Sequence, residues 1–212
     1  SKTSDSDIVR IFLLEKYGGC WCDATTFSNE SLDNWLDKHI STGFFAFNKP
    51  GEDRLLSTWF LYSEENNYII KKWKERTILY WINHDKMHHY FWFHYLFNDL
   101  YNSDKKFQEL WDSTPKISAD GPHYIQKEGL LQTLSNLVKE HNDKVNTPIY
   151  KLTYKYDMKK YNENCNLSYL LNKVKNLPLI DSKIAFSKDF FSISKKNKWI
   201  TNSRSRQVAH LI

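Results

Sequence analysis

The first part of the chain changes from helical to extended hydrophobic spacing. Between Ser6, a typical N-cap residue, and Gly18, a typical helix end, apolar side chains recur every three to four residues and predict an amphipathic helix to Tyr17. These side chains are Ile8, Ile11 and Phe12. The short apolar run 20–22 then predicts a strand that delivers Asp23 at its end. A helix, a glycine turn, a short strand and an acidic loop are typical of α/β proteins.

The same two periodicities predict the elements farther along the chain. They are a helix over 31–40, strands over 43–48 and 55–62 around the turn Lys49-Pro50-Gly51, aromatic helices over 65–82 and 88–101 that pack as a hairpin, a helix over 128–141 and an extended run over 149–155. Pro115 and Gly121-Pro122 predict a loop before the helix over 128–141.

The composition of the chain changes after Asp157. Lys, Asn and Ser become frequent there, around one apolar helix over 167–174. We therefore divide the chain into a core over 1–157 and a Lys/Asn-rich helical extension over 158–212. The end of the extension is basic, with Lys195, Lys196, Lys198, Arg204 and Arg206. Such a basic end either docks on anionic lipid or is simply solvated, and both interpretations stay open.

Length and composition favour one folded globular protein. The 212 residues fit one domain, and with 41% hydrophobic and 16% aromatic residues the chain is able to bury a core. A net charge of +5 favours phosphate-bearing ligands, but the basic end is short and lacks a motif that reads bases, so we expect no nucleic-acid partner. No apolar run reaches about 18 residues and no leader opens the chain, so we expect neither a membrane span nor a signal peptide.

The three cysteines favour free thiols. Their number is odd, and Cys20 and Cys22 in a short strand suit reduced thiols better than a disulfide framework. A Cys-x-Cys pair also lacks the two-residue gap and the second pair of a zinc knuckle. We expect a cytoplasmic location, where thiols stay reduced.

Three charged residues near the start are candidates for chemistry. Asp7 and Arg10 are three residues apart on one helix, so they share a face and offer an acceptor and a fork of donors to a polyhydroxylated ligand. The alternative is a surface ion pair. Asp23 follows a strand, where ligands of open α/β sheets bind, and the alternative is a loop cap.

Several segments in order resemble a known family. The runs SDIVRIFLLEKYGGCWCDATTF, STWFLYSEENNYIIKKW, YWINHDKMHHYFWFHYLF and IYKLTYK, over roughly residues 4 to 156, resemble the capsular polysaccharide synthesis family of glycosyltransferases, relatives of the DXD sugar-binding group. The resemblance implies a GT-A-like fold, with a Rossmann-type sheet flanked by helices. It also implies that roughly 80 to 100 residues with the first strands precede Ser6, so we expect this chain to lack its N-terminal strands.

The resemblance also implies a function. The expected enzyme is a retaining hexosyltransferase that moves a sugar from a nucleotide-sugar donor, a UDP-sugar, to a glycan or lipid-linked acceptor in capsular or surface polysaccharide synthesis. A divalent cation, Mn²⁺ or Mg²⁺, would offset the charge of the leaving diphosphate. If the basic end of the chain docks on the inner face of an anionic membrane, it would bring the enzyme to lipid-linked acceptors. The alternative is a non-catalytic carbohydrate-binding or scaffolding relative of the same fold.

Residue by residue, the resemblance assigns a donor site. Asp23 is the expected metal ligand and catalytic carboxylate, and Asp7 and Arg10 are expected beside the donor sugar or ribose. Two positions depart from the wider pattern, because Thr25 stands where a second acidic residue is usual and Tyr150 where relatives carry His. Alternation would place Lys151, Thr153 and Lys155 on one strand face, which offers two ammonium groups to a diphosphate, unless the strand is a solvated edge.

Aromatic segments supply the remaining candidates. Tyr90 and His94 are four residues apart in a predicted helix, so both can face one cleft, where His94 would orient or deprotonate an acceptor hydroxyl. The alternative for this run is core packing. The resemblance places Trp59 and Phe60 beside the acceptor, where aromatic faces stack on sugars. The expected catalytic residues are thus Asp23, Arg10, Tyr90 and His94.

Overall fold

The computed structural model describes residues 2–144 and 147–175, which fall into two compact units. The first unit contains residues 2–24 and 33–119, and the second contains residues 25–32 and 120–175 as far as the chain is described. The boundaries of these units differ from those of the predicted catalytic core over 1–157 and extension over 158–212. That functional division stays a prediction. The basic residues of the end, from Lys195 to Arg206, lie outside the described residues.

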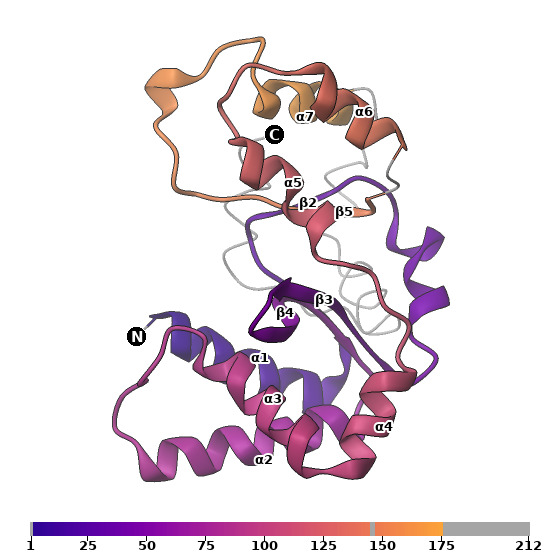
Figure 1. Ribbon diagram of the computed structural model, residues 1–212, viewed down its shortest axis with the longest axis vertical. Coiled ribbons are helices and arrows are strands. Elements are labelled where there is room, and N and C mark those ends of the chain that lie inside the picture. The colour runs from indigo at the N-terminus through magenta and orange to yellow at the C-terminus, as the bar shows by residue number, and fades with distance from the viewer. Residues whose placement is uncertain (1, 145–146, 176–212) are drawn as a thin grey trace, which may run out of the picture. The chain divides into compact units, whose positions relative to one another are not determined.

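The first unit is a small sheet with a layer of helices on one face (Figure 1). Its strands have the order β1-β4-β3, and each neighbouring pair is antiparallel. Helices α1 and α3 pack on the sheet, and α2 and α4 pack against them. The elements are α1 (Lys2–Tyr17), β1 (Gly19–Cys22), two 3-10 turns (Leu32–Asn34 and Leu36–His39), β3 (Phe44–Gly51), β4 (Arg54–Ser63), α2 (Tyr68–Asn83), α3 (Trp92–Ser103) and α4 (Lys105–Ser113).

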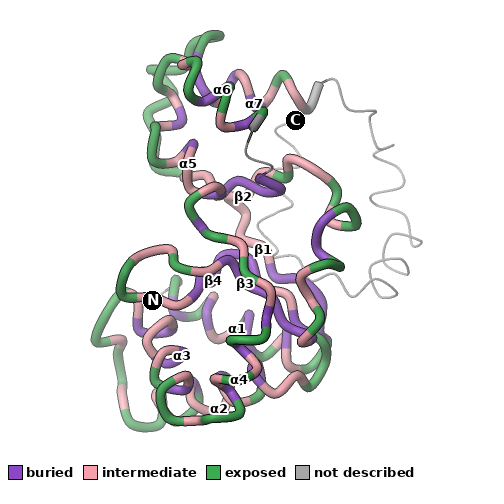
Figure 2. Tube along the Cα trace, turned by 45° about the vertical axis from the view of Figure 1, so that its right-hand side comes forward, coloured by how far each residue is buried: buried purple, intermediate pink, exposed green. Residues whose placement is uncertain are grey.

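Strand alternation explains how the sheet fills both faces. On β3, Phe44 faces the helices and stacks with Phe97 of α3, whereas Phe45 points to the other face and packs against Trp35. Buried residues run along β3 and β4 (Figure 2). Under the sheet, Trp73 of α2 is fully buried, stacks on Phe93 at 4.1 Å between ring centroids and donates to its carbonyl at 3.0 Å. The aromatic content of the sequence therefore fills a core.

The second unit is smaller and has its own core. It contains β2 (Thr26–Ser28) and β5 (Ile149–Lys151), which form an antiparallel pair, together with α5 (Asp120–Glu128), α6 (Asn136–Lys144), the 3-10 turn Met158–Lys160 and α7 (Asn166–Lys175). Side chains from α5, the loop that follows it, α6, β5 and α7 meet in its core. They are Ile125, Leu130, Val138, Tyr150 and Leu170.

Most of the predicted elements are present. The first helix ends at Tyr17 as expected, and Gly18 follows with a φ of +62°, a conformation in which a Cβ would lie 2.7 Å from the Glu65 nitrogen. The strand over 20–22 and the two aromatic helices are also confirmed. All three cysteines are free, as predicted.

Several local predictions are wrong. Residues 31–40 form two 3-10 turns in place of one helix, and the hairpin turn lies at Glu52-Asp53, because β3 continues through Pro50, which an irregular edge strand tolerates. Gly121-Pro122 lies in the first turn of α5, where a missing N–H costs nothing. The helix predicted over 128–141 begins at Asn136, and α4 was not predicted.

The chain is of the mixed α/β class that was predicted. Its described strands pair antiparallel, so the parallel, Rossmann-type sheet of a GT-A-like fold stays a prediction. None of the helices within residues 2–144 and 147–175 has the length and apolarity needed to span a bilayer.

Candidate functional site

A buried arginine joins two carboxylates at one end of the first unit. Arg10 on α1 is only 4% exposed. Its Nη1 lies 3.3 Å from Asp7 Oδ1 and its Nη2 lies 3.4 Å from Asp23 Oδ1. Nη1 also donates to the Thr58 carbonyl of β4 at 2.5 Å, and Nη2 donates to the Ser6 hydroxyl at 3.4 Å. The shared face of Asp7 and Arg10 is therefore confirmed, but it faces the interior of the unit and not solvent.

Asp23 is held at the end of β1 and is still partly accessible. Its backbone N–H donates to the Trp59 carbonyl at 2.8 Å, which continues the pairing of β1 with β4. Its Oδ1 accepts from Trp21 Nε1 at 3.1 Å and from Arg10, whose guanidinium lies 5.1 Å from the Trp21 ring centre. The Asp23 side chain is 28% exposed, against 5% for Arg10. Asp23 is thus the most accessible of the three charged side chains, Asp7, Arg10 and Asp23.

Asp7 is the buried member of the cluster. Burial raises its pKa from 3.8 to about 6, the Arg10 guanidinium opposes the rise, and the Asp23 carboxylate adds to it. Arg10 supplies one cation for two carboxylates, so the charges around it do not fully compensate Asp7. Asp7 therefore takes up a proton in mildly acidic solution.

His94 lies beside the same cluster. Its Nε2 is 3.4 Å from the Thr58 hydroxyl, and its Nδ1 is buried without a hydrogen-bond partner among the described residues. Burial, together with the positive charges of Arg10 and Arg54, lowers its pKa from 6.5 to about 3. The imidazole is neutral at physiological pH and binds a proton too weakly for an efficient general base, so its surroundings do not support the predicted proton-accepting role.

Sequence comparison supplies the family. A family model described as "Capsular polysaccharide synthesis protein" matches residues 1–172. The chain belongs to this family. Its Asp7, Arg10 and Asp23 cluster lies within the matched part.

A curated relative points in the same direction over a shorter stretch. The chain is 33% identical over 86 residues to "O-glycosyltransferase PaGT" of Phomopsis amygdali, which covers 37% of this chain and 21% of that protein. The chain thus spans about a fifth of the length of the curated relative that it matches. No solved structure matches the chain significantly.

Thr25 and Tyr150, the two positions at which this chain departs from the wider family pattern, both make contacts within the second unit. The Lys151 ammonium donates to the Thr25 hydroxyl. Tyr150 is fully buried and donates to Asn142 Oδ1 at 3.0 Å, and burial raises its pKa to about 12. The strand ends at Lys151, so the predicted strand face shared with Thr153 and Lys155 is wrong. The Leu152 N–H still donates to the Thr25 carbonyl at 2.7 Å, and the backbone bends at Tyr154.

The described residues do not form a metal site of their own. Within residues 2–144 and 147–175, no three His, Cys, Asp or Glu side chains are placed to share an ion. Asp23 Oδ1 already faces the Arg10 guanidinium, and the Thr25 hydroxyl faces the Lys151 ammonium. Hard cations prefer several oxygen ligands without adjacent positive groups. This donor set therefore does not fit a protein-built Mn²⁺ or Mg²⁺ site.

Of the three aromatic candidates, Trp59 and Phe60 are buried and Tyr90 is exposed. Phe60 is 1% exposed and Trp59 is 6% exposed, and Trp59 stacks on Phe47 at 5.0 Å. A sugar would reach either ring only if this packing opened. Tyr90 is 65% exposed and precedes α3, which begins at Trp92, so the four-residue helical spacing to His94 does not apply. The predicted pairing of Tyr90 with His94 is wrong.

Two contributors were missed by the sequence reasoning. Trp21 orients Asp23, and this was open to prediction, since side chains two residues apart in an extended run share a face. The Thr58 carbonyl holds Arg10 from 48 residues away along the chain. A backbone acceptor leaves no signal in side-chain pattern.

Proposed function

We propose that the protein transfers a sugar from a nucleotide-sugar donor to a hydroxyl acceptor. The observation that carries the proposal is Asp23, a partly exposed carboxylate fixed at a strand end by the buried Arg10 and by Trp21. Membership of the capsular polysaccharide synthesis family supports it, and so does the partial likeness to a protein named as an O-glycosyltransferase.

In the proposed reaction, the bond between the anomeric carbon and the diphosphate oxygen breaks, and the acceptor oxygen bonds to that carbon. Attack on the face that the diphosphate leaves retains the configuration, and the acceptor proton passes to the departing diphosphate. Asp23 accepts hydrogen bonds from donor hydroxyls and orients the sugar. Arg10, at 4% exposure, acts by holding Asp23 and not by touching the donor.

The finer features of the proposal follow from the family resemblance. The donor is a UDP-linked hexose, and the acceptor is a glycan or lipid-linked oligosaccharide of a surface polysaccharide. The dependence on Mn²⁺ or Mg²⁺ that the resemblance implies stays a prediction that the first experiment tests.

The experiment measures nucleoside diphosphate release and sugar transfer by the full protein against a panel of nucleotide sugars, with Mn²⁺, Mg²⁺ or a chelator. Asp23→Asn keeps the shape of the side chain and removes its charge, and its matched control is Asp37→Asn, an exposed carboxylate on a 3-10 turn of the same unit. We expect Asp23→Asn to lower turnover by about a hundredfold or more. Near-normal turnover in Asp23→Asn would refute the role of this carboxylate.

A second function is favoured by Thr25 and Tyr150. Thr25 carries no charge and is engaged by Lys151, and Tyr150 is buried where relatives carry His, so a carbohydrate-binding relative without activity fits both positions. A folded protein that binds a nucleotide sugar but releases no diphosphate with any metal would establish this alternative.

A further inference from the structure

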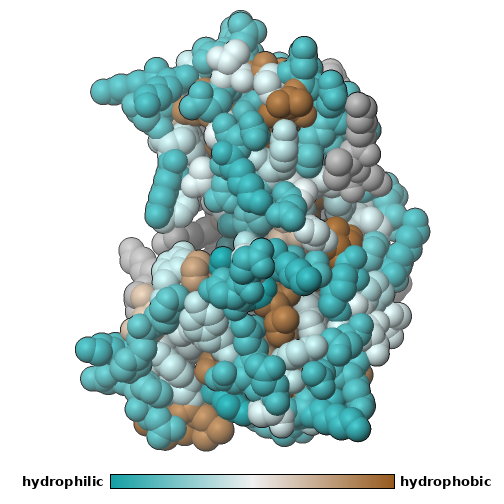
Figure 3. All heavy atoms as spheres, in the orientation of Figure 1, coloured by the Kyte–Doolittle hydropathy of each residue, from teal (hydrophilic) through white to brown (hydrophobic). Residues whose placement is uncertain are grey.

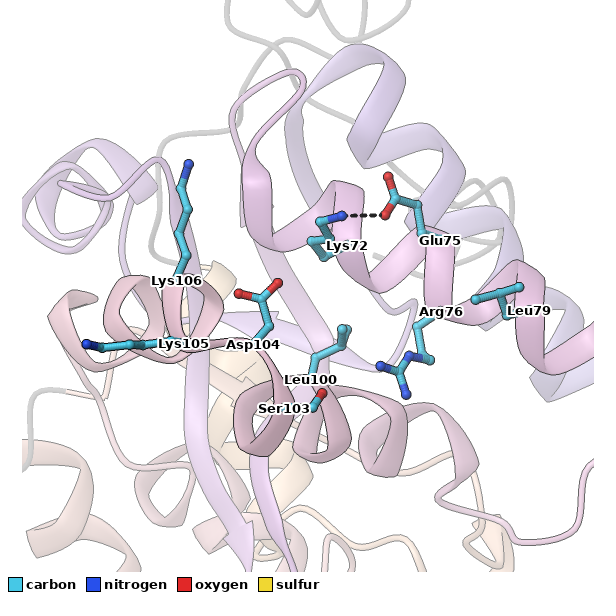
Figure 4. Close-up of a pocket in the computed structure, with 9 residues that line it drawn as sticks. All are labelled: Lys72, Glu75, Arg76, Leu79, Leu100, Ser103, Asp104, Lys105 and Lys106. Atoms are coloured by element: carbon cyan, nitrogen blue, oxygen red, sulfur yellow. Dashed lines mark hydrogen bonds and ion pairs between the residues drawn. The ribbon is translucent and has the colours of Figure 1, made fainter.

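A basic cavity of about 560 Å³ opens between α2 and the junction of α3 with α4 (Figure 4). All of its walls belong to the first unit, away from the Asp23 cluster in sequence. Its charged lining residues are four cations and two carboxylates. They are Lys72, Arg76, Lys105, Lys106, Glu75 and Asp104.

The two carboxylates are already engaged. Glu75 pairs with Lys72 at 2.8 Å. Asp104 caps α4, because its carboxylate accepts from the Phe107 N–H at 3.0 Å, and it also accepts from the Tyr68 hydroxyl at 2.8 Å. These bonds, the backbone N–H first, lower the pKa of Asp104, so it stays ionised as a structural cap.

The remaining cations are left without matching anions. No carboxylate of the described residues forms an ion pair with Arg76 or Lys106, although the Lys106 ammonium lies 4.4 Å from the Tyr68 ring centre. Lys105 approaches Glu109 only at 3.7 Å, with both side chains mostly exposed. Such exposed pairs are weak. The cavity therefore carries an excess of positive charge next to the first turn of α4, whose N–H groups add to it.

Exposed aliphatic side chains lie next to this charge. Leu79 lines the cavity and is 54% exposed, Ile78 is 38% exposed and Ile82 is 71% exposed. Ile82 is three and four residues beyond the other two, so the three form one surface on α2. Hydrophobic atoms gather at the lower edge of the molecule in Figure 3, where α2 lies in the same view of Figure 1. We name Ile78, Leu79 and Ile82 the aliphatic edge.

We propose that the basic cavity and the aliphatic edge together dock on an anionic membrane surface. The phosphodiester of an anionic lipid occupies the cavity, and the aliphatic edge enters the boundary between headgroups and acyl chains. Charge decides the occupant, because a neutral protein surface would leave Arg76 and Lys106 buried without a counter-charge, whereas a phosphodiester supplies one. The inference rests on the proposed function in one respect, since docking brings the enzyme to lipid-linked acceptors.

The test measures binding of the full protein to vesicles by flotation. Vesicles of phosphatidylcholine alone are compared with vesicles of phosphatidylcholine and phosphatidylglycerol in equal parts. A headgroup variant, Arg76→Gln with Lys105→Gln and Lys106→Gln, has a matched control in Lys38→Gln with Lys49→Gln, two exposed lysines of the same unit. Ile82→Ser has a matched control in Leu137→Ser, which is 65% exposed on α6.

We expect binding only to the anionic vesicles. At roughly fivefold for each basic residue, the headgroup variant should bind on the order of a hundredfold more weakly, and Ile82→Ser should also weaken binding, while both controls bind as wild type. Equal binding to both kinds of vesicle, or wild-type binding by the headgroup variant, overturns the proposal. A third outcome also overturns the proposal: glycerol phosphate in solution binds as tightly as the vesicles do, and Ile82→Ser weakens neither interaction. The cavity would then bind a soluble phosphate.

Transfer to a water-soluble acceptor separates this inference from the proposed function. Both variants should keep wild-type transfer to such an acceptor, because they alter the surface of α2 and α4 and not the Asp23 cluster. If the wild type transfers no sugar but still floats with anionic vesicles, the proposed function fails and the docking surface stands.

Discussion

Replacing Asp7 with Asn should change how the stability of the protein depends on pH. Asp7 is 7% exposed, and burial raises its pKa from 3.8 to about 6. The folded chain thus holds this proton more tightly than the unfolded chain. The contribution of Asp7 to stability is therefore greatest below pH 3.8, and it falls as the pH rises to about 6.

The size of the effect follows from the same pKa. A rise from 3.8 to about 6 corresponds to about 3 kcal/mol between low and neutral pH. Asparagine has the shape of the protonated side chain but no titrating group. The free energy of unfolding of Asp7→Asn, relative to wild type, should therefore increase by about 3 kcal/mol between about pH 3 and about pH 7. This change with pH does not depend on what the substitution costs at any one pH.

Urea unfolding of both proteins across this pH range measures the difference. Asp99→Asn, at an exposed position on α3, is the control and should show no comparable change. A constant difference between Asp7→Asn and wild type would refute the reasoning, and so would a difference that shrinks toward neutral pH. Either result would mean that the Arg10 guanidinium compensates the buried carboxylate in full.

Three further predictions follow from single contacts. Tyr150→Phe leaves the buried Asn142 Oδ1 without its donor and should lower the free energy of unfolding by about 1 to 3 kcal/mol in urea unfolding, and no loss would contradict the bond. Gly18→Ala places a Cβ at 2.7 Å from the Glu65 nitrogen at a φ of +62° and should lower the free energy of unfolding by more than about 1 kcal/mol, as expected for a strained backbone, and an unchanged free energy of unfolding would contradict this. Mn²⁺ alone should leave the melting temperature unchanged, because Asp23 is a single carboxylate beside a guanidinium, and a clear rise in thermal scans would reveal a metal site.

The sequence predicted the local parts of the fold better than the long-range parts. The helix before Gly18 and the strand over 20–22 depend on spacing and on one glycine, and both are present. The turn at Lys49-Pro50-Gly51 was wrong because an irregular edge strand accommodates Pro50, and pairing with β4 overrides local turn preference. Gly121-Pro122 misled in the same way, since both residues suit a helix start as well as a loop.

For the candidate site, the sequence identified the charged residues but not their surroundings. The spacing of Asp7 and Arg10 predicted a shared face, yet it did not show that the face is buried. Burial depends on β4, whose Thr58 carbonyl accepts from Arg10. Likewise, the pattern around His94 did not reveal that burial, with Arg10 and Arg54 nearby, lowers its pKa to about 3.

The burial of Arg10 also decides how the site should be tested. A buried guanidinium with Asp7, Asp23 and the Thr58 carbonyl as acceptors ties α1 to the end of β1 and to β4. Removing it leaves two carboxylates without a counter-charge, so Arg10→Ala should unfold the site as well as inactivate it. Loss of activity in that variant says little about chemistry. Asp23→Asn removes only the exposed end of the network, keeps a side chain that still accepts from Trp21, and therefore separates the role of Asp23 in the reaction from its role in the fold.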